Sequence, residues 1–475
     1  MSKKGSFLFA LTVMAVFSFV QAQSSGEGGK VFLPEGLSLI PHAYAHMEAG
    51  QIGQGSLKYD DWAGANHLSN SFKIDHIWTE DADLEFGFTA IYRERLKLAF
   101  SLGASLYFSY PVLNKARFTK NMRQDIYLDE INAQYHFGDA DMPWLLAQIG
   151  YFKFKYNPEV LNLGEYLFRT GTYPIWFNMG FDAPFQRMFG LHLQSNLVKS
   201  LKLDVLLSSA TVAPAMNWSL SCLADYDVAA LHFVHIGAGV EFAHIFDVYT
   251  DHTYPDFGGD PTTPSNFNVS FKYVKAPGDT EWYTFKGTKV MGRISIDPKA
   301  FIHWKYFGEN DLKLYAEADL IGLESYPDSV VNQTGGLEFK APSYDNWKEK
   351  MPISIGFYLP TFKALDALNL EVEWFGAKYY NDASNVINWG SQPLPYSVDI
   401  YGNVSGAFPN APAKSPIKWS VYAKKTFFNG HFALTGQIGR DHMRLTCASY
   451  SDELWNELLV ESTDWWWVIK TSWMF

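Results

Sequence analysis

Apolar and polar side chains alternate along most of this chain with a period of two residues. The alternation is clearest in residues 96–108, where every second residue is apolar: Leu96, Leu98, Phe100, Leu102, Ala104, Leu106 and Phe108. Successive side chains of a β-strand point to opposite faces, so the pattern predicts a strand with one apolar and one polar face. Asn429-Gly430 lies between two such segments and is a strong hairpin signal.

The pattern predicts strands throughout the chain, and the gaps between them alternate between short and long. We expect strands at residues 37–49, 84–92, 96–108, 125–137, 143–156, 189–196, 201–209, 211–223, 228–246, 288–306, 312–320, 353–359, 368–374, 417–427, 431–440 and 465–475. Residues 50–83 are polar and rich in glycine, and we read them as a connection.

The segments form about 16 strands, and a number from about 14 to 18 remains open because boundaries are the least certain part of such a reading. Strand 211–223 is a poor one because it contains Pro214. We expect one all-β domain over residues 37–475, a transmembrane antiparallel up-and-down β-barrel. A large secreted all-β protein, such as a sandwich or propeller, is the alternative.

The last segment offers two unlike faces. Trp465, Trp467, Ile469, Thr471, Trp473 and Phe475 lie on one, and Trp466, Val468, Lys470, Ser472 and Met474 on the other. Its length suits a bilayer, which a tilted strand crosses with roughly 9–11 residues. The aromatic at Trp473 and the terminal Phe475 resemble the closing-strand signal of bacterial outer-membrane barrels, which prefers a polar residue at Val468 and Gly at Lys470. The resemblance implies an assembly signal read by the barrel-assembly machinery.

The N-terminus carries a second signal. Lys3 and Lys4 precede an apolar run from Phe7 to Val20, and Val20-Gln21-Ala22 is a small-residue cleavage site. This is typical of a secretory signal peptide and is too short to span a bilayer as a helix. We therefore expect a signal peptide at residues 1–22, cleavage near Ala22, a periplasmic segment at 23–36, and a barrel in the outer membrane.

Composition fits this interpretation. No long apolar run follows the signal, and the mean hydropathy is −0.13, which excludes a helical membrane protein but not a barrel, whose two faces average out. Aromatic residues make up 17%, with 16 Trp and 27 Tyr, enough for two interfacial girdles. A net charge of −12 without basic clusters argues against nucleic-acid binding.

Cys222 and Cys447 could form a disulfide or remain two separate thiols.

The polar faces of the expected strands carry charges of both signs. Lysines and acids such as Lys313, Glu317, Glu371 and Glu373 need water or each other. A barrel of about 16 strands leaves more room than side chains fill, so we expect these residues to line an aqueous lumen. A salt-bridge network around a plugged lumen is the alternative.

Residues 157–188 form an unusual connection, because their first part is rich in apolar residues where an exposed loop should be polar. In general porins, the third outer loop folds into the barrel and narrows the pore, and residues 157–188 hold that place here. The resemblance implies that Glu165, Arg169 and Arg187 lie at a constriction beside Lys153 and Lys155. A cap outside the barrel is the alternative.

The stretch from Gly150 to Lys153, followed by Glu159 or Glu165 and later by Arg187, Gly190 and Leu191, is similar to the corresponding region of phosphate-selective porins of the O and P type. That family's run of lumenal Arg and Lys is missing here. We therefore do not extend phosphate selectivity to this chain.

Catalytic and metal signals are weak. Asp441-His442 and Asp251-His252 are acid–histidine pairs, but neighbours on a strand point to opposite faces, and the sequence holds no Gly-x-Ser-x-Gly elbow. We expect no enzyme, no cofactor and no metal site. Acidic connections containing Asp251, Asp256, Asp260 and Asp452 are read as solvated surfaces.

These observations predict a porin-like channel for passive diffusion of small hydrophilic solutes. The alternative is a non-channel barrel whose surface loops bind a ligand, a polysaccharide or a partner protein. Outer-membrane lipid and lipopolysaccharide are the expected surroundings, and a homotrimer is expected only by analogy with general porins.

Replacing Trp473 and Phe475 with Ser should impair assembly of the barrel rather than transport, because the change removes the terminal aromatic signal. The measurement is the amount of heat-modifiable protein in the outer membrane. A normal amount in the double variant would contradict the assignment.

Overall fold

A computed structural model gives the fold of the chain. It describes residues 35–60, 69–109, 121–139, 143–168, 186–198, 200–209, 218–228, 231, 233–243, 245, 272–273, 283–284, 287–302, 304–323, 329–331, 338–340, 347–376, 397–398, 404–405, 415–442, 459 and 461–475. The predicted signal peptide and residues 23–34 lie outside this part of the chain, as do Cys447, Asp251 and Asp452.

Sixteen strands close into one antiparallel barrel in which every strand pairs with its neighbours in sequence, and β22 pairs with β1. The predicted fold class and strand number are confirmed. The barrel strands are β1 (Leu37–Asp60), β2 (Ser69–Tyr92), β3 (Leu96–Ser109), β4 (Asn121–Gly138), β5 (Pro143–Phe154), β6 (Gln186–Val198), β7 (Leu201–Ser209), β8 (Trp218–Asp227), β9 (Val234–Ala243), β12 (Gly287–Ile296), β13 (Leu314–Leu320), β16 (Ile353–Tyr358), β17 (Ala367–Trp374), β20 (Ile417–Phe427), β21 (Phe432–Arg440) and β22 (Trp465–Met474).

Minor elements lie in the connections between barrel strands. They are three two-stranded sheets, β10 (Lys272–Tyr273) with β11 (Tyr283–Thr284), β14 (Ser329–Val331) with β15 (Glu338–Lys340), and β18 (Ser397–Val398) with β19 (Val404–Ser405), and four short 3-10 helices, η1 (Tyr166–Phe168), η2 (Pro298–Ala300), η3 (Trp347–Lys350) and η4 (Phe428–Gly430). No helix among the described residues is both long and apolar enough to cross a membrane.

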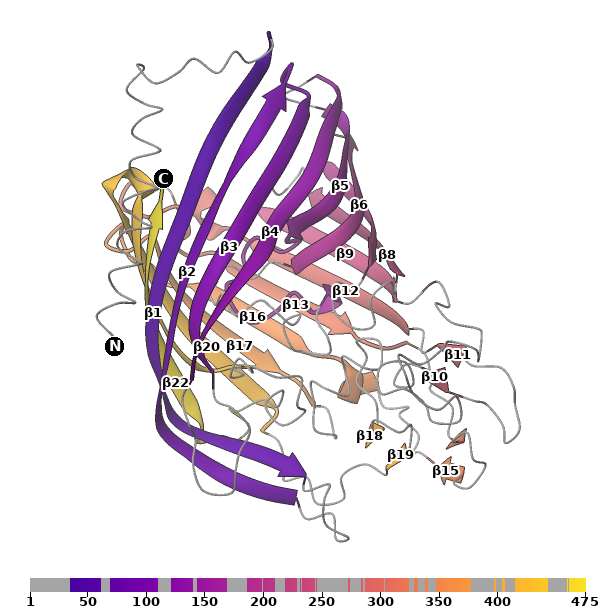
Figure 1. Cartoon of the computed structure of the whole chain (residues 1–475), viewed down its shortest axis with the longest axis vertical. Coiled ribbons are helices and arrows are strands. Elements are labelled where there is room, and N and C mark those ends of the chain that lie inside the picture. Colours follow the sequence, from indigo (N-terminus) through magenta and orange to yellow (C-terminus); the bar gives the residue numbers. More distant parts are fainter. Residues whose placement is uncertain are drawn as a thin grey trace.

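Short and long connections alternate around the barrel as predicted. The short ones include residues 93–95 between β2 and β3 and 428–431 between β20 and β21. The small sheets belong to long connections and lie away from the C-terminus, at the lower right of the barrel in Figure 1. Phe475 is therefore at the short-turn rim.

The barrel is apolar outside and polar inside. On β17, Leu370, Val372 and Trp374 are 37%, 39% and 38% exposed, whereas Asn369, Glu371 and Glu373 between them are 0%, 2% and 0% exposed. β22 repeats the pattern, with Ile469 exposed and Lys470 buried. An apolar outer surface around a polar interior is the arrangement of a barrel that spans a bilayer.

Closure depends on the pairing of β1 with β22. The ladder runs from Tyr44 opposite Met474 to Gln54 opposite Trp465, and Phe475 adds two backbone hydrogen bonds with Ala43, of 2.9 and 3.1 Å. Pro41 lies before the first residue that pairs with β22, where a missing N–H removes no bond to that strand. Pro41 is thus compatible with its place in β1.

Several predicted boundaries are wrong. Most of residues 50–83, read as a connection, belong to β1 and β2, which pair from Leu37 opposite Tyr92 to Asp60 opposite Ser69. Polar residues on both faces of this hairpin leave no alternation to detect. β8 starts at Trp218, after Pro214, which made the predicted strand 211–223 a poor one. β12 ends at Ile296, before Asp297-Pro298.

An aspartate connects two of the short turns at one rim of the barrel. Asp311, before β13, accepts hydrogen bonds from the N–H groups of Gly308, Thr361 and Phe362, of 2.8, 3.1 and 3.1 Å, and from the Thr361 hydroxyl at 3.0 Å. Burial favours the neutral form, but these bonds outweigh it and lower the pKa of Asp311 below its ordinary value. The turns before β13 and β17 are thereby tied together.

Asp311→Asn should destabilise the barrel at neutral pH by roughly 1–3 kcal/mol, because bonds to a charged acceptor become bonds to a neutral one. Because the pKa of Asp311 is lower in the folded than in the unfolded protein, its ionisation stabilises the fold at pH values above the ordinary pKa of about 3.9. This stabilisation is lost as the pH falls through the pKa that Asp311 has in the folded protein. The difference between variant and wild type, measured as the temperature at which heat modification occurs, should therefore shrink in acid. Glu309→Gln, at an exposed neighbour, is the control, and an equal effect there would contradict the assignment.

Candidate functional site

The connection after β5 folds into the barrel. We call its described part, residues 155–168, the inward segment. Leu163, Glu165, Tyr166 and Leu167 in it are 0% exposed, and η1 lies against β9 and β12. Figure 1 shows this segment in the colour of β5 within the barrel. The predicted inward folding of this connection is therefore observed over these residues.

The inward turn begins at Gly150. β5 pairs with β4 only as far as Tyr151 opposite Ile131, whereas its pairing with β6 continues to Phe154 opposite Gln186. Gly150 has φ of +126°, and a Cβ there would lie 2.3 Å from the Ile131 carbonyl oxygen. Only glycine fits this conformation, so the ends of β5 and β6 leave the barrel wall together.

Glu371 on β17 holds the middle of the inward segment. Its carboxylate accepts the backbone N–H groups of Leu161, Asn162 and Leu163 at 2.7, 2.9 and 2.7 Å, and the hydroxyl of Tyr315 at 2.5 Å. Consecutive N–H groups that converge on one anion form a nest, and each bond to a charged acceptor contributes about 1.5–3 kcal/mol. A lumenal carboxylate thus replaces the partners that these N–H groups would find in a sheet.

Glu317 on β13 holds both ends of the inward segment. It accepts bonds from the Tyr156 hydroxyl at 2.7 Å, the Asn157 side chain at 2.6 Å and the Tyr166 N–H at 3.0 Å. Glu373 on β17 accepts the Tyr166 hydroxyl at 2.7 Å. The inward segment is therefore bonded to β13 and β17 from its first residues to η1.

Asp441 and His442, the pair considered for catalysis, belong to the same network. They follow the end of β21, so strand alternation does not separate them, and both are buried. Asp441 accepts the Asn162 side chain at 2.7 Å, and His442 lies 2.8 Å from Glu373. Their contacts serve the attachment of the inward segment.

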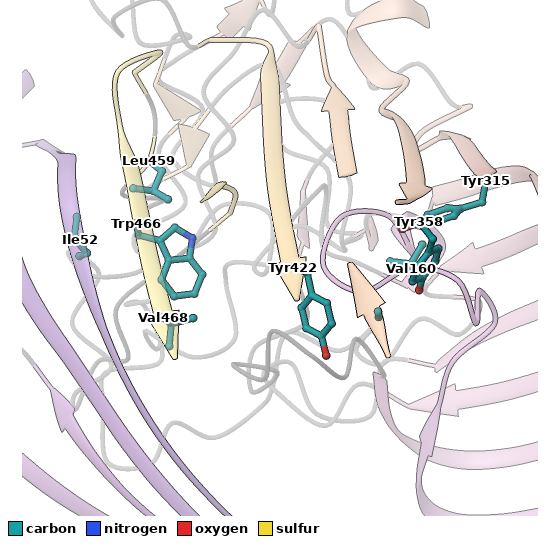
Figure 2. Close-up of a cluster of buried hydrophobic side chains, with 9 residues drawn as sticks. Ile52, Val160, Tyr315, Tyr358, Tyr422, Leu459, Trp466 and Val468 are labelled. Atoms are coloured by element: carbon teal, nitrogen blue, oxygen red, sulfur yellow. The ribbon is translucent and has the colours of Figure 1, made fainter. Parts of the chain in front are cut away.

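Apolar packing adds to these bonds. Figure 2 shows Val160 beside Tyr315 and Tyr358, in a cluster to which Trp466 and Val468 of β22 also belong. A second cluster surrounds the end of the segment: Phe152, Phe154, Tyr156, Leu167, Phe168, Met188, Leu206, Leu223 and Met291. Burying side chains of this size contributes about 1.5–3 kcal/mol each, which explains why the connection is apolar.

Gly239 on β9 makes room for this packing. A Cβ there would lie 2.7 Å from a methyl of Leu223 and 3.0 Å from one of Leu167. Pairing of β9 continues without a register shift past Gly237 and Gly239.

A charged cluster lies on the wall that the ends of β5 and β6 approach. Lys153 Nζ is 2.8 Å from Asp129 and 3.3 Å from Glu85, and Arg187 Nη2 is 2.9 Å from Asp129 and 3.6 Å from Glu85. Arg187 also covers the ring of Tyr127, 5.5 Å from its centre. Glu85 is on β2, three strands from β5, or about 14 Å at ordinary spacing. Lys153 and Arg187 thus extend over the inner face of β3 and β4.

The other candidates occupy different places. Lys155 Nζ donates to the Val160 carbonyl at 2.7 Å, and Glu165 accepts the Asn157 N–H at 2.5 Å, so both close the inward segment on itself. Lys313 lies 3.6 Å from Glu159 near the short-turn rim. Arg169 lies outside the described residues.

The candidates therefore form two groups. Lys153 and Arg187 belong to the charged cluster, while Lys155, Glu165, Lys313, Glu317, Glu371 and Glu373 belong to the inward segment or its attachment. Glu317, Glu371 and Glu373, which hold the inward segment, are 0–2% exposed and face the segment rather than open space. Their role in lining a pore stays a prediction.

Asp129 and Glu85 were missing from the sequence-based candidates. Strict alternation along the chain would put Asp129 on the face of Ile131, opposite Glu130. No group of His, Cys, Asp or Glu side chains in the described residues could hold a metal ion.

No protein-family model and no curated protein matches the chain. Solved structures that resemble it include OprB of Pseudomonas putida at high pH, with 10% identity and a TM-score of 0.45 over 93% of this chain and 94% of that one. OmpF of Salmonella typhi, in a complex with daunomycin, has 10% identity and a TM-score of 0.40 over 94% and 99%. DcaP, an outer membrane channel of Acinetobacter baumannii, has 10% identity and a TM-score of 0.39 over 93% and 99%. At these values, the fold assignment rests on the strand pairing itself.

Glu371→Gln should loosen the inward segment, because the amide offers donors where three N–H groups need acceptors. Hydrogen exchange at the amides of residues 161–163 should accelerate at least tenfold, the effect of losing about 1.4 kcal/mol. Glu130→Gln is the control, since Glu130 accepts a hydrogen bond from Asn132 on its own strand. Unchanged exchange at residues 161–163 would show that Glu371 does not hold the segment.

Proposed function

We propose that this barrel is an outer-membrane channel through which small hydrophilic solutes diffuse passively. The observation that carries the proposal is a charged lumenal cluster that stays partly exposed inside a barrel with an apolar outer surface. The side chains of Lys153, Glu85 and Arg187 are 27%, 15% and 15% exposed. Charges of this kind need water, which a barrel of this width holds in its lumen.

The aqueous path runs along the wall made by β1 to β6. Asp81 on β2 is 25% exposed there, in contrast to the 1% of Glu317 on the opposite wall. The inward segment covers that opposite wall and fills its part of the lumen. The path is therefore off-centre and passes the charged cluster, which makes Lys153 and Arg187 the constriction residues of this proposal.

Phosphate selectivity is not part of the proposal. Lys153 and Arg187 are both within 2.9 Å of Asp129, so a carboxylate already occupies the position that an anion would take. The same proposal includes cleavage near Ala22, assembly by the barrel-assembly machinery and a location in the outer membrane. It also includes contact with lipopolysaccharide and assembly into a homotrimer. The short turns would face the periplasm, as they do in bacterial barrels.

Purified protein in a planar bilayer should give stable steps of open-channel conductance. Heat-denatured protein at the same concentration is the control, and heat modification in a gel shows that the inserted sample is folded. A correctly folded, inserted barrel that stays silent would overturn the channel and favour a barrel that acts through its surface loops.

A further inference from the structure

Asp129 faces the lumen because β4 has a bulge. In the pairing of β3 with β4, Ser101 is opposite Glu130 and the next residue, Leu102, is opposite Leu128, which leaves Asp129 without a partner. Without the bulge, Asp129 would share the outer face with Ile131, which is 48% exposed. With the bulge it is 2% exposed.

The two oxygens of Asp129 bind the two cations of the charged cluster, one each. Oδ2 is 2.8 Å from Lys153 Nζ, and Oδ1 is 2.9 Å from Arg187 Nη2. Glu85 is farther from both, at 3.3 and 3.6 Å. Asp129 is thus the nearest counter-charge of both cations, and it holds them over β3 and β4.

Acids outnumber bases around the cluster. The cluster itself holds two acids and two bases, and Asp83 on β2 lies beside it and accepts the Tyr127 hydroxyl at 2.5 Å. Next to it, Asp81 is 3.8 Å from His46. Loss of Asp129 would leave Glu85 as the counter-charge of both cations and make the cluster more positive by one charge.

We propose that Asp129 is the residue that determines the charge selectivity of the lumen: it neutralises and positions Lys153 and Arg187, so that small cations pass more readily than anions. This inference rests on the proposed channel function. Asp129 acts through the two cations, and its effect is on which ions pass rather than on whether the barrel conducts.

The test is the reversal potential in a gradient of KCl. The wild type should favour K⁺, and Asp129→Asn should lower the ratio of K⁺ to Cl⁻ permeability roughly fivefold, because one unit charge about 8 Å away in water changes the two ions by about 2.4-fold each, in opposite directions. Asp129→Glu should retain the preference for K⁺. Glu130→Gln is the matched control, because it removes the neighbouring carboxylate on β4, which accepts a hydrogen bond from Asn132.

Lys153→Gln gives an independent measurement should Asp129→Asn fail to fold, which heat modification detects. Removing this cation should shift the reversal potential in the opposite direction, toward K⁺. A lumen that conducts but favours Cl⁻, an unchanged potential in Asp129→Asn, an equal shift in Glu130→Gln or an unshifted Lys153→Gln would each overturn the role of Asp129. A wild type without conductance would instead overturn the proposed function.

Discussion

The structure depends on the requirement that every strand edge be paired. A sheet with an apolar outer surface cannot leave backbone N–H and C=O groups without partners in a bilayer, and closure of β1 on β22 removes the last two edges. Closure also separates the two faces, because each strand must turn alternate side chains inward. The buried charged residues of the described strands are thereby gathered around one interior.

This gathering explains how an irregular segment can be buried in the lumen. The backbone of residues 157–166 lacks a sheet ladder, so its N–H groups need acceptors from elsewhere. Glu317 and Glu371 supply them, and the apolar side chains of the segment pack on tyrosines, leucines and methionines of the wall. Removing either partner would leave a buried charge or a buried N–H group unpaired, which costs more than the bond itself contributes.

The segment also makes the two halves of the lumen unlike. Glu317, Glu371 and Glu373 accept hydrogen bonds from its backbone and hydroxyl groups. The carboxylates of Glu85 and Asp129 instead pair with the partly exposed Lys153 and Arg187. The glycine at position 150 directs both arrangements, since it lets the ends of β5 and β6 leave the wall. A single turn of the backbone thus connects the filled half of the interior with the charged one.

The sequence by itself determined the barrel, a number of about sixteen strands, the alternation of short and long connections and the inward face of most strands. All of these follow from local alternation and from turn residues, which a period of two makes legible. It also indicated that the apolar connection after β5 folds against something.

Only the tertiary structure decided which carboxylates bind the inward segment and which pair with the lumenal cations. Glu317, Glu371 and Glu373 share the polar faces with many other charges. Nothing in their spacing indicates that Glu317 and Glu371 accept backbone N–H groups, and Glu373 a tyrosine hydroxyl, of a segment more than 150 residues earlier in the chain. Asp129 could not be found at all, because one extra residue in β4 reverses the face on which it lies. A bulge leaves no mark on the composition of a strand, so its effect is visible only once the neighbouring strand fixes the register.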